Sequence, residues 1–230
     1  MQKNKFTTYL LYAIGEIVLV VVGILIAVSI NDWNQGRKDA VLQEKILQSL
    51  RDDLRYNLIE IQRVMFEDSV QTVKNRLLLS LMFDPQSKYN DSLQTYFGEI
   101  SRYDVFSPRR MAYEALKVKG LEIIESEPLR SEIIKLYDEK YPLNALMLDL
   151  RKDLHINSVN LYNKRFLTME KVNNKIPIDF EQLKKDQEFI NSLSYIAAEG
   201  SNFVRHLNSM RTQTKIVMDK ISQELLRLSE

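Results

Sequence analysis

The sequence predicts an all-α protein with a single N-terminal transmembrane helix, followed by an up-down bundle of long helices with short capping helices. Residues 9–30 form an almost unbroken apolar stretch. Only 6 Gly and 5 Pro interrupt the 230 residues, which favours long helices and few turns. Beyond the apolar stretch, apolar residues recur every three or four positions, the spacing of helices that bury one face.

The apolar stretch is long enough to cross a membrane. About 21 residues of helix span roughly 31 Å, and the hydrocarbon core of a bilayer is about 30 Å thick. Tyr9 and Tyr12 lie at one edge and Trp33 at the other, where aromatic rings favour the headgroup level. We expect these three residues to anchor the helix at the membrane interfaces, with residues 1–8 as an N-terminal flank.

A cleavable signal peptide is the alternative for this segment. The uninterrupted apolar run 17–28 is short enough for one, and Ala27-Val28-Ser29 resembles a weak cleavage site. However, the apolar zone continues upstream of Glu16 through Leu10 and Leu11. We therefore expect a retained anchor that binds the lipid bilayer.

One face of the span carries small residues and a carboxylate. Gly15, Leu19, Gly23 and Ala27 share a stripe at four-residue spacing, and Glu16 lies beside it. Small residues let two helices approach closely, so this face predicts self-association with the acid in the seam, and hence a homo-oligomer. Two alternatives stay open for Glu16. Its side chain could reach the lipid headgroups, or a ring of such residues could line an ion pore.

The remaining chain divides into a juxtamembrane segment, 31–37, with a possible break, and a helical-bundle domain, 38–230. The first bundle helix is expected to follow more or less directly from the span and to end at Asp84-Pro85. A strict heptad would bring Asn57 and Asp68 into its apolar seam, which argues against a long coiled coil. The apolar seam comprises Leu47, Leu50, Leu54, Leu58, Ile61 and Met65.

Two short helices, about 92–103 and 107–119, are expected to cap the distal end of the bundle. Ser107 followed by Pro108 is typical of a helix start, and Gly120 of a helix end.

Two further long helices complete the expected bundle. One begins near Glu127 after Ser126 and runs to about Leu167, with a kink or break at Pro142. A loop at 173–177 and a capping box at Asp179 follow. The last helix covers about 188–227 and buries a seam of Gly200, Phe203, Leu207, Met210, Thr214, Val217 and Ile221.

The composition argues against several kinds of chemistry. Lys and Arg number 32 against 31 Asp and Glu, so nothing indicates a nucleic-acid partner. Cysteine is absent, and His155 and His206 lack the spacing of metal ligands. Adjacent carboxylates such as Asp52-Asp53 and Glu125/Glu127 are read as solvated surface. We expect no cofactor, no metal and no enzymatic activity.

A second candidate site lies among the short helices. Tyr103, Phe106 and Tyr113 cluster there, together with Arg109 and Arg110. Aromatic and arginine side chains are enriched at protein interfaces, so these residues could form a partner surface. The alternative is that the aromatic residues belong to the core and that the two arginines form an intramolecular salt-bridge site.

Two stretches resemble a known family. Residues 12–27, with Asn31, Trp33 and Asn34 after them, are similar to a Bacteroidota family of membrane proteins of unknown function. A weaker likeness comprises Phe106, Ala112-Tyr113-Glu114, Leu116 and Gly120. The resemblance implies a cytoplasmic N-terminus and a periplasmic helical domain, hence the bacterial inner membrane. Charge alone does not decide this topology, because basic residues flank the span on both sides.

Three functions are compatible with these observations. The first is a non-enzymatic, self-associating envelope protein whose bundle serves as a scaffold or accessory subunit, with other membrane or envelope proteins as partners. The second is a ligand-sensing bundle that signals through a partner. The third is a channel or ion-coupled subunit that uses Glu16.

Overall fold

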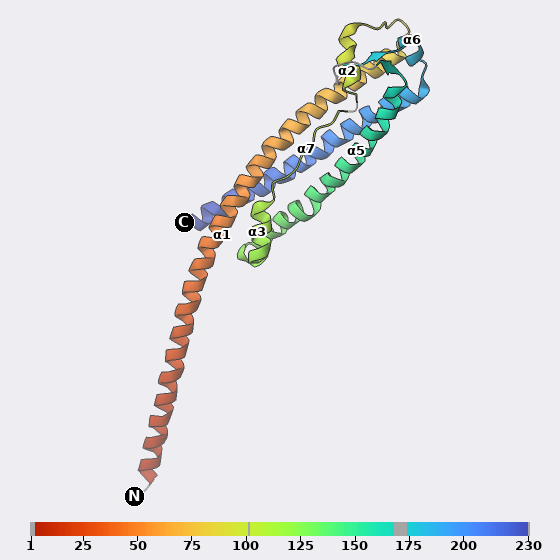
Figure 1. Cartoon of the computed structure of the whole chain (residues 1–230). Helices are drawn as coiled ribbons and strands as arrows, with labels where there is room; N and C mark the ends of the chain where they lie inside the picture. Colours follow the sequence, from red (N-terminus) through yellow and green to blue (C-terminus); the bar gives the residue numbers. More distant parts are fainter. Residues whose placement is uncertain (1–2, 101, 168–173, 230) are drawn as a thin grey trace.

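The computed structural model describes residues 3–100, 102–167 and 174–229, and it confirms the all-α class (Figure 1). Helix α1, Lys3–Phe83, has 81 residues, or about 120 Å of helix. Its N-terminal part stands clear of the rest of the molecule, and its C-terminal part belongs to the bundle (Figure 1).

The possible break after the apolar stretch is not found, because α1 is helical throughout residues 31–37. A single Gly36 costs a helix only about 1 kcal/mol, and local contacts support this turn. Gln35 Nε2 donates to Asp39 Oδ1 at 3.0 Å, and the Arg37 guanidinium lies 5.6 Å from the Trp33 ring centre. The bundle is therefore joined to the apolar stretch by a continuous rod.

Two further long elements complete the bundle. Helix α7, Gln187–Ser229, runs antiparallel to α1 and ends near the point where α1 leaves the bundle (Figure 1). The third element comprises α4, Glu127–Ile134, a π-helical turn, Lys135–Lys140, and α5, Tyr141–Asn163. This up-down arrangement agrees with the sequence prediction.

As predicted, α1 belongs to a helical bundle and not to a long coiled coil, but its buried face follows heptad spacing and two polar residues do not interrupt it. Asn57 and Asp68 do lie in this seam. Both are buried with polar partners from other segments, so the heptad continues through them. The buried positions of α1 that follow this spacing are Leu47, Leu50, Leu54, Asn57, Ile61, Val64, Asp68, Gln71, Asn75, Leu78 and Met82. The expected seam of α7 is confirmed from Gly200 to Ile221.

Only one of the expected capping helices lies at the distal end. There, a turn at Asp91–Leu93 leads into α2, Gln94–Gly98. Helix α3, Met111–Lys119, lies at the opposite end of the bundle (Figure 1). The non-helical residues 102–110 connect the two ends. Nine extended residues reach about 30 Å, which is long enough for this connection.

The start of α3 also differs from the prediction. Pro108 lies in the extended segment, and the helix begins at Met111. The Asn57 side chain holds this segment: its Oδ1 accepts from the Arg109 N–H at 2.7 Å and its Nδ2 donates to the Arg109 carbonyl at 3.1 Å. The end of α3 at Gly120, which has φ of 108°, is confirmed, and so is the start of α4 at Glu127.

Pro142 does not end the third element. The π-helical turn Lys135–Lys140 comes just before it and α5 starts at Tyr141. The Tyr141 N–H donates to the Leu136 carbonyl, five residues back. The wider turn lets the element continue although Pro142 has no N–H to donate.

The distal end contains a short ladder that the sequence did not predict. Helix α5 ends at Asn163, earlier than expected, and β1, Phe166–Leu167, pairs antiparallel with β2, Ile176–Pro177. Of the expected loop, Asn173 lies outside the described residues. Asp179 caps α6, Phe180–Leu183, by accepting from the Gln182 N–H at 2.9 Å, as predicted.

Candidate functional site

The apolar stretch of α1 is fully exposed within the molecule. Across the described residues, one helix is long and apolar enough to cross a membrane, with a mean hydropathy of 2.8 over its best 18 residues. None of that window is buried against the chain. Tyr9, Tyr12 and Trp33 are exposed as well, and Trp33 follows Tyr9 by 24 positions, or about 36 Å of helix. These positions suit the two interfaces of a bilayer.

The small-residue stripe forms an unoccupied face on this helix. Leu19 is exposed on this side of the helix, with Leu11 and Tyr12 close by, and no other part of the chain covers it. A Cβ added at Gly15 or at Gly23 would meet no atom within 4 Å. The packing within this chain therefore gives no reason for a small residue at either position. Ala27 lies on the same side of the helix, one turn beyond Gly23.

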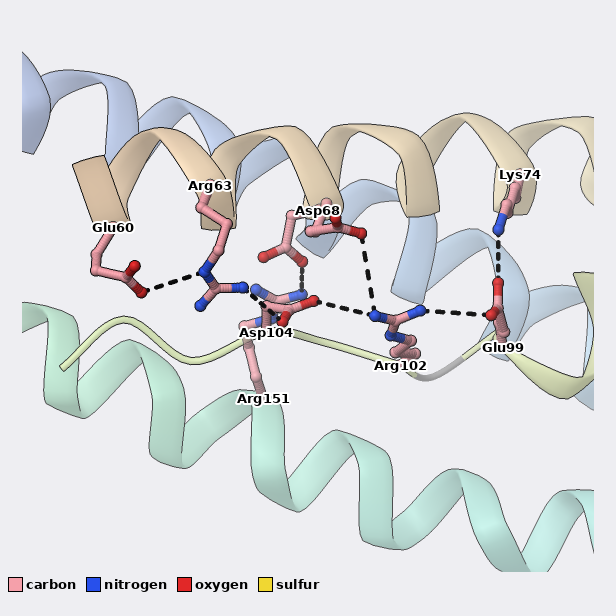
Figure 2. A network of polar contacts seen from close by, with 9 residues as sticks. Glu60, Arg63, Asp68, Lys74, Glu99, Arg102, Asp104 and Arg151 are labelled. Atoms are coloured by element: carbon pink, nitrogen blue, oxygen red, sulfur yellow. Dashed lines mark hydrogen bonds and ion pairs between the residues drawn. The ribbon is translucent and has the colours of Figure 1, made fainter. Parts of the chain in front are cut away.

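A polar network that sequence reasoning missed lies inside the bundle, between α1, α5 and the segment 102–104 (Figure 2). At its centre, Arg151 of α5 donates to the Asp68 carboxylate of α1, and both side chains are buried. The Arg151 guanidinium also lies 4.1 Å from the ring centre of Phe203 in α7 and 5.4 Å from that of Tyr103. Burial raises the pKa of Asp68, while Arg151 opposes this effect.

More exposed ion pairs extend the network along α1 (Figure 2). Arg63 contacts Asp104 at 3.2 Å, and Lys74 contacts Glu99 at 2.6 Å. Arg102 lies between Glu99, at 3.4 Å, and Asp104, at 3.8 Å. These contacts tie the segment after α2 to α1, so the network fixes the path of the chain back along the bundle.

A small cavity lies beside the central ion pair. Arg102, Tyr103, Arg151, His155 and Gly200 are among its lining residues, and its volume is about 20 Å³. A water molecule needs about 10–15 Å³ on this measure, so the cavity has room for one water and is too small for an organic ligand.

The residues expected to form a partner surface are not one surface. Phe106 and Tyr113 are 1% and 0% exposed, so these two belong to the core, which was the alternative. Tyr113 donates to Asp138 at 2.6 Å and stacks on Tyr137, with ring centres 4.5 Å apart. Burial raises the pKa of Tyr113 above its ordinary value.

The other three members of that set face different neighbours. Tyr103 is half-buried beside Arg151, and the Arg109 guanidinium lies 3.4 Å from the ring centre of Tyr56. Arg110 bridges Glu114, at 3.2 Å, and Asp138, at 3.5 Å. The structure thus gives Arg109 and Arg110 intramolecular partners.

The histidines and paired carboxylates form no metal site among the described residues. His155 is half-buried with its ring 5.8 Å from that of Tyr103, and His206 is half-buried beside Phe203. Burial lowers the pKa of His206. Asp53 is not simple solvated surface, because it accepts from the Ala112 N–H at 3.0 Å and so caps the start of α3.

These features define a class of protein, in which one long helix carries an apolar, uncovered stretch and continues into an antiparallel helical bundle with a buried ion pair. The chain belongs to DUF6090, a family of unknown function, which it matches over residues 16–201. The match starts at Glu16 and ends in α7, so it takes in most of the apolar stretch and most of the bundle. No curated protein and no solved structure matches the chain.

Proposed function

We propose that this chain is a non-enzymatic, membrane-anchored scaffold that self-associates through its transmembrane helix. The span sits in the inner membrane of a bacterium of the Bacteroidota, with the N-terminus in the cytoplasm and the bundle in the periplasm. There the bundle serves as an accessory subunit for other membrane or envelope proteins.

The observation that carries this proposal is the unoccupied face at Gly15 and Gly23. Both glycines weaken a helix interior by about 1 kcal/mol relative to Ala, and no contact within the chain requires them. In a membrane, small residues allow a second helix to approach closely, which supports a seam on this side. Glu16 lies at the edge of that seam, where a partner helix can supply the hydrogen bonds that lipid cannot.

The test compares two substitutions that both enlarge an apolar side chain. Gly23→Leu fills the proposed seam, whereas Val21→Leu, two residues away, changes nearly the opposite side of the helix. We expect Gly23→Leu to convert the solubilised oligomer to a smaller species and Val21→Leu to leave its mass unchanged. Glu16→Leu should leave insertion intact and also change the oligomer. An unchanged mass for Gly23→Leu and Glu16→Leu would contradict the seam.

Glu16 alone favours a second candidate, an ion-conducting or ion-coupled assembly. An intramembrane carboxylate is a common feature of ion pathways. Glu16→Gln removes the charge and keeps the shape, so it should abolish conductance in reconstituted vesicles if ions pass. A scaffold would show no conductance before or after the substitution.

A further inference from the structure

We propose that a second copy of this chain packs against the bundle part of α1, in parallel and in register, along an exposed apolar stripe. The stripe comprises Ile59, Phe66, Val70, Val73 and Leu77. The inference rests on the proposed self-association through the span, and it adds a second contact outside the membrane.

The stripe is a continuous feature of one helix face. Its residues follow one another at steps of seven, four, three and four, so their side chains project from the same side of α1 over about 27 Å. Phe66 and Val73 are each 66% exposed. Large apolar side chains in such a row are a feature of interaction surfaces more than of a solvated helix face.

The chain's own bundle lies on the other side of the helix. Val73 is nine residues, or about 2.5 turns, from Val64, and Phe66 is equally far from Asn75. Val64 and Asn75 are buried in the seam with the rest of the bundle. The stripe therefore faces directly away from α5 and α7, and an occupant must come from another molecule.

The stripe and the span's small-residue face lie on the same side of α1. Leu19 and Val73 are 54 residues apart, as are Gly23 and Leu77, and 54 residues make about 15 full turns. Since α1 is helical without interruption between them, a regular period of 3.6 residues per turn places the two faces in this common phase. Two copies that meet through Leu19 and Gly23 in the membrane would bring their stripes face to face.

A second copy is the occupant that the anchor itself provides. Spans in one membrane with the same orientation hold their α1 helices parallel and at the same height, and they raise the local concentration of one stripe near another. A two-fold axis along such a pair makes each residue face its own counterpart. Five side chains are far fewer than the roughly 20–30 residues a side of a standard interface, so the stripe should hold only copies that the span keeps side by side.

The absence of cysteine from the sequence allows a direct test in native membranes. Val73→Cys places one thiol in the stripe. Asn202→Cys is the matched control. Asn202 is exposed on α7, two residues after Gly200, and Gly200 lies against Thr72, the residue before Val73. The two cysteines would therefore lie at the same level along the bundle. Each variant is expressed as two differently tagged copies and oxidised with a copper–phenanthroline catalyst. We expect the disulfide-linked homodimer to form at least tenfold faster with Val73→Cys than with Asn202→Cys.

The outcomes separate this inference from the proposed function. Equal rates of dimer formation at the two positions, or no dimer with Val73→Cys, would overturn the stripe contact. The span seam would still be supported in that case if Gly23→Leu changes the oligomer. Because the stripe should hold only copies that the span keeps side by side, Gly23→Leu should also slow formation of the Val73→Cys dimer. Rapid dimer formation that survives Gly23→Leu would contradict this dependence on the span.

A second pair of variants tests the contribution of the stripe to assembly. Phe66→Glu puts a charge into the stripe, and Tyr195→Glu puts one at an exposed aromatic position on α7. Both sites are on the surface, so helical content should not change. We expect Phe66→Glu to reduce the Val73→Cys dimer at least fivefold and Tyr195→Glu to leave it unchanged. Equal effects of the two variants would overturn the proposal.

Discussion

Arg151 of α5 donates a hydrogen bond to Asp68 of α1 inside the bundle, where neither side chain is open to solvent. The same guanidinium lies over Phe203 of α7, so the three long elements of the bundle meet at one residue. A charge at this depth is tolerated because its partner is fixed by the register of the helices. The pair thus makes the alignment of α1 with α5 specific.

Removing either partner should destabilise the bundle strongly. Arg151→Met leaves the Asp68 carboxylate buried without its cation, and Asp68→Leu leaves the guanidinium alone. We expect each to lower the free energy of unfolding by about 3–5 kcal/mol. The double variant should be more stable than either single one, because no charge remains uncompensated. Guanidinium unfolding of the full chain in detergent, followed by circular dichroism, measures all three. A loss under about 1 kcal/mol in both single variants would show that the pair is not closed from water.

The close approach of α7 to α1 at Gly200 should be sensitive to one methyl group. Gly→Ala in a helix interior is ordinarily stabilising by about 1 kcal/mol. At Gly200, however, a Cβ would collide with the Thr72 hydroxyl, so we expect Gly200→Ala to destabilise by about 1–3 kcal/mol. Thr72→Ala removes that hydroxyl. In its background, Gly200→Ala should become neutral or stabilising, and a double-mutant cycle measures this coupling. Additive effects would contradict the contact.

The hydrogen bonds by which Asn57 holds the segment before α3 should also contribute to the stability of the bundle. Its amide contacts the Arg109 backbone and also donates to the Tyr141 hydroxyl at 3.2 Å. Asn57→Leu keeps the branched shape but leaves buried polar groups without partners, so we expect the free energy of unfolding to fall by about 1–3 kcal/mol. Asp52→Asn, on the exposed surface nearby, serves as the control and should change stability by less than about 0.5 kcal/mol. Similar losses for the two variants would argue that these hydrogen bonds contribute nothing.

Stability should fall as the pH is lowered below neutrality, and His206 should account for part of the fall. Burial lowers the pKa of His206 in the folded chain below its ordinary value of 6.5, so the unfolded chain binds the proton more tightly. The stabilisation present above pH 6.5 is lost as the pH falls through and below that value. His206→Gln should show a smaller decrease in Tm between pH 7.5 and 5.5 than the unmodified chain. Identical decreases would contradict the assigned shift.

Much of the fold could be predicted because it depends on neighbours in the sequence. The end of α3 at Gly120, the start of α4 after Ser126 and the cap at Asp179 each follow from short-range chemistry. The seam of α7 follows from apolar spacing, which needs no knowledge of what it packs against.

The errors over the seam of α1 and the place of α3 share a physical cause, since each depends on a partner distant in sequence. Asn57 and Asp68 looked like interruptions of a heptad because Arg109 and Arg151, which satisfy them, are 52 and 83 residues away. The place of α3 depends on the hydrogen bonds of Asn57 and on Asp53. The sequence did contain a signal, namely polar residues at seam positions of a helix. Such residues are typical of buried polar pairs, and here they belong to such pairs and do not break the pattern.

The central claim is that the N-terminal part of α1 stays in a lipid bilayer as one rod with the bundle. Carbonate washing of native membranes, followed by N-terminal analysis of the recovered chain, tests it most directly. We predict that the chain stays with the membrane pellet and still contains residues 9–30. Recovery in the soluble fraction, with a new N-terminus downstream of Ser29, would contradict the account.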